Sequence, residues 1–205
     1  MQRARPCTGD ERERARAASP HPPPLGRRVV VVGNTAAGKS TLARALAAHL
    51  GVPHIELDAL HWEPCWTPTP PERFRARVEA ATAAEGWVAD GNYGPVRDLL
   101  WARAETIAWL DYPFATLLLR LTRRTLHRTL RRERLWGTNQ ETLWRHLATR
   151  DSLYWWLATT FRRRRRELSA AIRGSEYPQL RWVRLRSPRA TERWLAALGE
   201  RDCAG

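Results

Sequence analysis

The sequence predicts an α/β fold in which a five-stranded parallel sheet is flanked by helices. Three observations point to this fold. Short, apolar, β-branched segments alternate with longer amphipathic segments along most of the chain. The first apolar segment, Val29–Val32, suits a central strand that is covered on both faces. It runs directly into a glycine-rich loop and then into a helix, an order typical of a phosphate-binding unit.

The glycine-rich loop is Gly33-Asn34-Thr35-Ala36-Ala37-Gly38-Lys39-Ser40-Thr41, which matches the pattern G-x-x-x-x-G-K-[ST]. We expect this segment to bind a nucleotide, with its backbone N–H groups around the phosphates. Lys39 would reach the β and γ phosphates, and Ser40 would give its hydroxyl to Mg²⁺. Lys39 is the only lysine among 35 basic residues, which indicates a position that needs a compact ammonium group.

The helix after this loop is expected to bury Leu42, Leu46 and Leu50 and to end at Gly51. A second strand over 54–58 would then deliver Asp58 to the carboxyl edge of the sheet, where ligands of open parallel sheets bind. An aromatic loop with Trp62 and Trp66 follows. It either forms a wall of the acceptor site or simply covers the sheet.

A capping box at Thr69–Glu72 predicts a helix from about Pro70 to Glu85, which Gly86 ends. The third strand, Trp87–Gly91, ends in an acid. Asp90 is therefore expected to anchor Mg²⁺ through water, and the alternative is that it caps the next turn.

After a short helix with Val96, Leu99 and Leu100, a fourth strand over 106–111 leads to a long helix that begins at Pro113. Its predicted buried stripe consists of Leu117, Leu118, Leu121 and Leu130. Its cationic face consists of Arg120, Arg124, Arg128 and Arg131. Such a face either clamps a nucleotide or is solvated.

Residues 135–174 break the alternation of strands and helices and predict a helical, lid-like insert. A second capping box at Thr138–Glu141, and Asp151 or Ser152 as a further cap, are its expected helix starts. Phe161–Glu167 contains five consecutive arginines. A fifth strand over 180–186 and a last helix beginning at Ser187-Pro188 complete the chain.

Composition indicates one domain, 28–205, behind a disordered tail rich in arginine and proline, 1–27. The formal charge of +14 is concentrated in 1–28, 120–134 and 162–166. No apolar run could span a membrane and no secretory signal is present, so we expect a cytoplasmic protein. The cysteines at 7, 65 and 203 are far apart, which indicates free thiols.

In these motifs the chain resembles the P-loop small-molecule kinases of the adenylate-kinase-like branch. Within that branch it closely resembles the bacterial DNA topology modulation proteins, also known as adenylate-kinase-like ATPases. The resemblance lies in Gly33–Thr41, Leu57–Trp62, Asp90–Tyr93 and Leu110–Pro113. It implies that Asp90 holds a Mg²⁺-bound water.

The resemblance also implies that Arg120 lies on the adenine of ATP and that Arg124 lies on its phosphates. At the two positions where adenylate kinases grip the AMP phosphate with arginine, this chain has His61 and Gly94, although Arg97 is near. Asp58 resembles the acid of shikimate- and gluconate-kinase-like enzymes that contacts an acceptor hydroxyl.

Together these observations predict a Mg²⁺- and ATP-dependent phosphotransferase that acts on a nucleotide or another small acceptor. Its expected catalytic residues are Lys39, Asp58 and Arg124. One alternative is a nucleic-acid-binding protein that uses ATP as a switch, which is less favoured because no groove-binding motif is present. Another is a small-molecule kinase of the toxin type.

Overall fold

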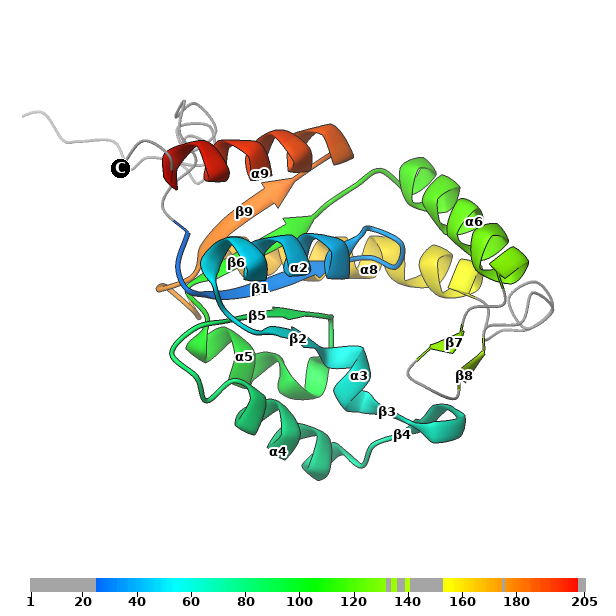
Figure 1. Ribbon diagram of the computed structural model, residues 1–205, viewed down its shortest axis with the longest axis horizontal. Coiled ribbons are helices and arrows are strands. Elements are labelled where there is room, and N and C mark those ends of the chain that lie inside the picture. Colours follow the sequence, from blue (N-terminus) through cyan, green and yellow to red (C-terminus); the bar gives the residue numbers. More distant parts are fainter. Residues whose placement is uncertain (1–24, 132–133, 136–138, 141–152, 175, 203–205) are drawn as a thin grey trace, which may run out of the picture.

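A computed structural model describes residues 25–131, 134–135, 139–140, 153–174 and 176–202. Its centre is one parallel sheet in the order β2-β5-β1-β6-β9 (Figure 1). These strands are β1 Arg28–Gly33, β2 His54–Glu56, β5 Trp87–Asp90, β6 Thr106–Leu110 and β9 Arg181–Leu185. The predicted fold class, a five-stranded parallel sheet flanked by helices, is confirmed. Most of the predicted tail, 1–24, lies outside the described residues.

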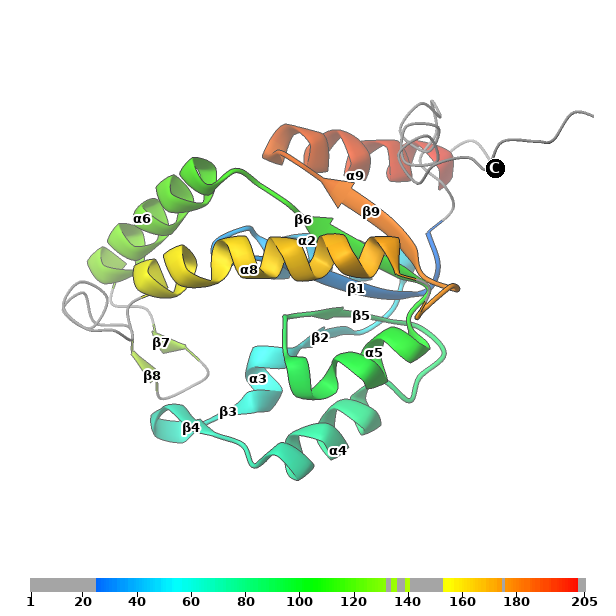
Figure 2. The ribbon, with the colours of Figure 1, turned by 180° about the vertical axis from the view of Figure 1, so that it is seen from behind.

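Helices cover both faces of the sheet, as Figures 1 and 2 show from opposite sides. They are α2 Lys39–Leu50, α3 Leu57–His61, α4 Pro71–Ala81, α5 Arg97–Arg103, α6 Phe114–Arg131, α8 Leu153–Arg173 and α9 Pro188–Asp202, with 3₁₀ turns η1 Pro64–Trp66 and η2 Gly94–Val96. Two short antiparallel pairs join β3 Trp62–Glu63 to β4 Thr67–Pro68 and β7 Arg134–Leu135 to β8 Asn139–Gln140. Within the described residues, no helix has both the length and the apolar character needed to cross a membrane.

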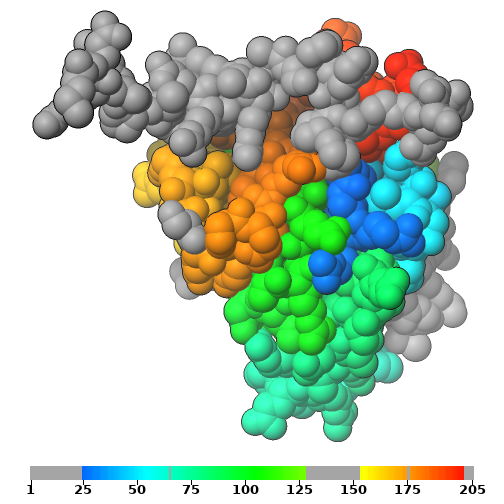
Figure 3. All heavy atoms as spheres, turned by 90° about the vertical axis from the view of Figure 1, so that its left-hand side faces the viewer, coloured from blue at the N-terminus to red at the C-terminus, as the bar shows by residue number. Residues whose placement is uncertain are grey.

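The valines of β1 alternate between two apolar clusters, one on each face of the sheet. Val29 and Val31 pack with residues of α2, α6 and α9, whereas Val30 and Val32 pack with residues of α4 and α5. A strand buried on both faces needs such a continuous β-branched run. At the end where the strands begin, the Arg28 guanidinium donates a hydrogen bond to Glu105 at 3.0 Å. Figure 3 views this end, with the blue start of β1 next to green residues of the α5–β6 region.

The strand order brings three loops together at the opposite edge. β5 lies between β2 and β1, and its last residue, Asp90, is in register with Glu56 on one side and Val31 on the other. The residues that follow β1, β2 and β5 therefore meet at one edge of the sheet.

The second strand is shorter than the sequence predicts. It ends at Glu56, so Asp58 lies in the first turn of α3 and not at the end of a strand. Leu57 is fully buried and packs against Gly91, whose φ is +147°. A Cβ on Gly91 would come within 2.9 Å of Leu57, so this close approach requires glycine at position 91.

The predicted capping box at Thr69 is wrong. The Thr69 hydroxyl donates to the Leu60 carbonyl at 3.3 Å and accepts from Arg77 at 3.0 Å, so it is not available to cap α4. The helix also ends at Ala81 and not near Glu85, and the Thr82 hydroxyl bonds back to the Val78 carbonyl at 2.8 Å. In contrast, the Ser187 cap is confirmed by its hydrogen bond from the Ala190 N–H at 3.1 Å.

The predicted insert over 135–174 differs from the structure in two respects. Asn139 and Gln140 form a strand, although a helix start was expected there; Thr138, Glu141, Asp151 and Ser152 lie outside the described residues. The α8 helix buries Leu157 in one core cluster and Leu168 in the other. It therefore packs as part of the domain body.

The buried stripe predicted on α6 is confirmed for Leu117 and Leu121 but not for Leu118, which is 38% exposed. The side chains of 128–131 lie outside the described part.

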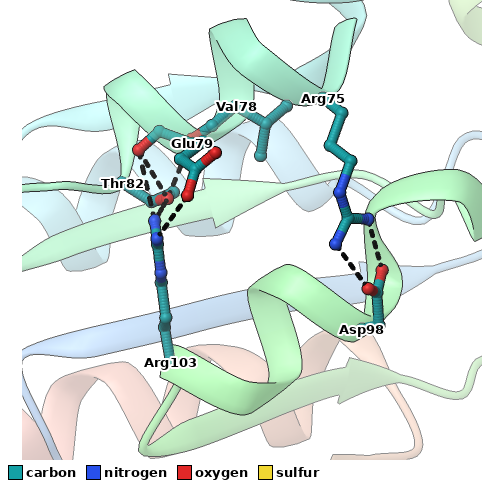
Figure 4. Close-up of polar contacts among 6 residues, drawn as sticks. All are labelled: Arg75, Val78, Glu79, Thr82, Asp98 and Arg103. Carbon is teal, nitrogen blue, oxygen red and sulfur yellow. Dashed lines mark hydrogen bonds and ion pairs between the residues drawn. The ribbon is translucent and has the colours of Figure 1, made fainter. Parts of the chain in front are cut away.

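Two arginine-centred contacts join α4 to α5 (Figure 4). Both guanidinium ends of Arg75 donate to the Asp98 carboxylate, at 2.8 and 2.6 Å. From α5, Arg103 donates to the Thr82 hydroxyl at 2.9 Å and to the Glu79 carboxylate at 3.0 Å. These contacts hold together two helices that pack on one face of the sheet.

The Arg75–Asp98 pair leads to a prediction about pH. The hydrogen bonds from Arg75 lower the pKa of Asp98 from 3.8 to about 2. A carboxyl whose pKa is lowered by folding stabilises the fold above its unfolded pKa, so this contribution is lost as pH falls from 3.8 to about 2. NMR titration of the Asp98 carboxyl should show the low midpoint. Arg75→Gln should return it toward 3.8.

The control is Arg73→Gln, because Arg73 lies on the same helix but pairs with Glu63. Salt should weaken the effect, since both partners are exposed. An unchanged Asp98 midpoint in Arg75→Gln would contradict the prediction.

Candidate active site

The predicted phosphate loop joins the end of β1 to the start of α2. Its backbone adopts the left-handed region at Ala36, with φ of 58°, and at Gly38, with φ of 94°. The Ala37 N–H donates to the Asn34 carbonyl at 3.3 Å, which closes a tight turn. The loop therefore has the sharp curvature that lets successive N–H groups face a bound anion. Thr41, the last residue of the predicted motif, is exposed on α2.

Asn92 holds the start of this loop. The Asn92 side-chain oxygen accepts from the Gly33 N–H at 3.2 Å, and its side-chain NH₂ donates to the Gly33 carbonyl. Both backbone groups of Gly33 are thus paired with the turn after β5. The sequence analysis did not assign this role to Asn92. The only indication was that Asn92 lies in Asp90–Tyr93, one of the segments that carry the resemblance.

Lys39 lies inside the loop, where its ammonium donates to the Asn34 carbonyl at 3.3 Å. Burial lowers the pKa of Lys39, while the carboxylates of Asp58 and Asp90 act in the opposite direction. The charge of Arg164 lowers this pKa further. A desolvated ammonium with nearby arginines favours an anion beside it.

Ser40 and Asp90, the predicted magnesium residues, are in direct contact. The Ser40 hydroxyl donates to Asp90 Oδ2 at 2.6 Å, and Asp90 is only 5% exposed. Their two oxygens are of the hard type that Mg²⁺ prefers, so they fit an ion that takes its other ligands from phosphate and water. Among the described residues, no group of three or more His, Cys, Asp or Glu side chains could hold a metal ion.

Asp58, whose charge also acts on Lys39, is held by Tyr93. The Tyr93 hydroxyl donates to Asp58 Oδ1 at 2.6 Å. Burial raises the pKa of Tyr93, and the charge of Asp58 raises it further, so the phenol keeps its proton and remains a donor. The sequence analysis did not identify this contact.

His61 packs in an aromatic cluster beside Asp58. Its ring centre lies 4.7 Å from that of Tyr93, 4.8 Å from that of Trp62 and 4.9 Å from that of Phe74. Burial lowers the pKa of His61, which favours the neutral ring. A neutral ring cannot replace the arginine that adenylate-kinase-like enzymes carry at this position.

The two arginines predicted on α6 face the phosphate loop. Arg120 Nε donates to the Ala36 carbonyl at 3.1 Å, and Arg120 Nη2 lies 3.0 Å from the place where a Cβ on Gly38 would stand. The charge of Arg124 lowers the pKa of Lys39, so Arg124 is also close to the loop. Glycine at 38 thus leaves room for the Arg120 guanidinium over the loop.

The five-arginine run on α8 has several roles. Arg165 Nε contacts Asp111 Oδ1 at 3.1 Å, and Asp111 is buried and also accepts from Arg184 at 2.7 Å. This contact fixes α8 to the end of β6, so Arg165 serves the fold.

Arg163 and Arg164 face a cavity of about 290 Å³ between α8 and the turn after β5. Its lining residues are Asn92, Gly94, Arg97, Arg163, Arg164, Glu167 and Leu168. Glu167 lies 3.6 Å from both Arg97 and Arg163. Three arginines therefore share one carboxylate in the cavity lining. Burial and the charge of Arg163 lower the pKa of Arg164, so the cavity is short of negative charge.

The site leads to a prediction for Lys39. Replacing Lys39 with alanine should weaken ATP binding by about 100-fold, because the buried cation that faces the phosphates is lost. Lys39→Arg should be similarly impaired, since a planar guanidinium does not fit where a compact ammonium does. Fluorescence titration with a labelled ATP would measure both. Arg44→Ala, which removes an exposed cation from the same helix, is the control, and wild-type affinity in Lys39→Arg would disprove the role of Lys39.

Neither a protein-family model nor a curated protein matches this chain. Among solved structures it is similar to shikimate kinase from Bacteroides thetaiotaomicron, with 18% identity and a TM-score of 0.50 over 84% of this chain and 96% of that one. A gluconokinase from Sinorhizobium meliloti 1021 has 20% identity, a TM-score of 0.46 and coverage of 86% and 93%. Shikimate kinase from Acinetobacter baumannii in complex with shikimate has 15% identity, a TM-score of 0.49 and coverage of 87% and 94%. The first likeness shows that the chain shares the fold of a P-loop kinase.

Proposed function

We propose that this protein is a Mg²⁺- and ATP-dependent phosphotransferase that acts on a small acceptor. The observation that carries the proposal is the convergence of three elements on one loop. These are the half-buried ammonium of Lys39, the Ser40–Asp90 oxygen pair, and the Asp58 carboxylate, whose charge acts on Lys39. Phosphoryl transfer depends mainly on positioning and on neutralising charge, and these residues suit both tasks.

On the donor side, the loop N–H groups and Lys39 would hold the β and γ phosphates. Mg²⁺ at Ser40 and Asp90 would offset part of their negative charge. Arg120 and Arg124 would contact the nucleotide from α6. This assignment agrees with the resemblance to adenylate-kinase-like enzymes and with the position of Arg120 over Gly38.

On the acceptor side, Asp58 would accept a hydrogen bond from the acceptor hydroxyl and orient its oxygen. The bond from that oxygen to the γ-phosphorus would form while the bond from the γ-phosphorus to the β,γ-bridging oxygen breaks. The hydroxyl proton would pass to the Asp58 carboxylate, and ADP would leave. Tyr93 would keep Asp58 in place for this step.

The acceptor we favour is a small molecule that also carries a carboxylate or a phosphate. The lining of the cavity next to Asn92 contains three arginines and one carboxylate, and the charge of Arg164 also acts on Tyr93 beside Asp58. An acceptor long enough to reach from Asp58 into this cavity would place its hydroxyl at Asp58 and its anionic group among the arginines. His61 stands at a position where adenylate kinases have an arginine that holds AMP. Arg97 is therefore the better candidate for binding the anionic group of the acceptor.

The test is a transfer screen with γ-labelled ATP across nucleoside monophosphates, nucleosides, sugar acids and neutral sugars. Anionic acceptors should outperform their neutral counterparts. Arg97→Ala should raise the KM for the anionic acceptors by about 10-fold, which is the loss expected for a charge-assisted hydrogen bond. Arg103→Ala is the control because Arg103 lies on the same helix but faces Glu79.

Two results would contradict this reading. Equal use of neutral and anionic acceptors would show that the arginine-lined cavity does not bind an anionic group of the acceptor. ATP hydrolysis that depends on DNA, without transfer to any small acceptor, would favour the nucleic-acid-binding alternative that the resemblance to DNA topology modulation proteins suggests.

A separate prediction concerns Tyr93. In Tyr93→Phe the Asp58 carboxylate loses its hydrogen bond, and kcat for transfer should fall by about 10-fold while ATP affinity stays the same. Asp58→Asn should lower transfer further and also spare ATP affinity. Tyr177→Phe is the matched control, since Tyr177 packs on Trp101 away from Asp58. Loss of ATP affinity in Asp58→Asn would instead move Asp58 to the nucleotide site.

A further inference from the structure

His54, at the start of β2, contacts the carboxylate of Asp90. Its Nε2 lies 2.9 Å from Asp90 Oδ1, and the His54 side chain is only 14% exposed. A carboxylate oxygen can only accept, so Nε2 is the donor in this hydrogen bond. The sequence analysis gave no role to His54.

The two oxygens of Asp90 therefore have different partners. Oδ2 accepts from Ser40, which belongs to the phosphate loop, and Oδ1 accepts from His54, which does not. His54 thus holds the carboxylate in an orientation that does not depend on the loop. Oδ2 stays directed at the loop as long as Oδ1 is held.

The imidazole ring is itself held in place by β2 and its neighbour. His54 pairs with Val88, and Glu56 pairs with Asp90, in the parallel register of β2 and β5. On its other side, Nδ1 lies 3.9 Å from Glu56 Oε1. Glu56 in turn accepts from Arg44 at 3.4 Å. A chain of polar contacts thus runs from the surface of α2 to Ser40, and His54 lies in the middle of it.

We propose that His54 is a positioning residue that orients Asp90 for magnesium. The inference rests on the proposed function, in which Asp90 anchors the ion. Side chains that hydrogen-bond to the residues around a metal fix their orientation, and their loss costs about 10- to 100-fold in metal affinity. Only Nε2 can donate the hydrogen bond to Asp90, because Nδ1 faces Glu56.

The experiment compares variants that keep or remove the donor at the Nε2 position. Glutamine places its NH₂ near the position of Nε2, whereas asparagine places it near that of Nδ1. The affinity of each full-length variant for a fluorescent ATP analogue is titrated with and without Mg²⁺. His54→Asn should lose about 10- to 100-fold of the Mg²⁺-dependent affinity and none of the Mg²⁺-free affinity. His54→Gln should stay within about threefold of wild type.

Thermal unfolding without nucleotide identifies any variant that does not fold, and His54→Met is then used as a second variant without a donor. Wild-type Mg²⁺ dependence in the folded His54→Asn and His54→Met variants would overturn the inference. Equal losses in His54→Asn and His54→Gln would also overturn it, because they would show a role in packing and not in hydrogen bonding.

Asp90→Asn separates this inference from the proposed function. If Asp90→Asn keeps its Mg²⁺ dependence, Asp90 is not the magnesium anchor and the proposed function fails at that point. If Asp90→Asn loses it while His54→Asn does not, only the role of His54 is disproved.

Discussion

The phosphate loop depends on a pair of hydrogen bonds between Asn92 and the backbone of Gly33. On the β5 side the strand pairing ends at Val31 and Asp90, so Gly33, the last residue of β1, has no strand partner there for its N–H and C=O groups. The Asn92 amide supplies both partners. Since Asn92 follows β5 directly, the same contact fixes Asp90 and Tyr93 relative to the loop. The donor and acceptor sides of the site are thus held together by one side chain.

The site also gathers positive charge around two carboxylates. Lys39 is half-buried, Arg120 lies over Gly38, and the charges of Arg124 and Arg164 act on Lys39 against those of Asp58 and Asp90. Mutual repulsion and desolvation make this arrangement unfavourable without an anion. Binding of polyphosphate would relieve both effects. Such a site gains more from a highly charged ligand than from a neutral one, which is the preference a nucleoside triphosphate requires.

The sequence predicts the parts of this site that are local and misses those that depend on strand order. The loop, Lys39 and Ser40 follow from spacing, because a strand, a loop and a helix are consecutive, and Asp90 follows from an acid at the end of an apolar strand. The contacts of Asn92 with Gly33 and of His54 with Asp90 exist only because β5 lies between β2 and β1. The spacing of residues along the chain does not show that β5 lies between β2 and β1. The capping box at Thr69 failed for a related reason, since a carbonyl from α3 competes for the Thr69 hydroxyl.

Arginine has three uses in this chain that a count of charges cannot distinguish. Arg165 neutralises the buried Asp111, Arg75 joins two helices, and Arg164 faces a cavity with little negative charge around it. Adjacent residues on α8 point in different directions, since successive positions on a helix are about 100° apart. The run of five arginines therefore does not act as one surface: Arg165 pairs with Asp111, whereas Arg163 and Arg164 line the cavity. The electrostatic surface that is left for a polyanion is smaller than the net charge of the chain suggests.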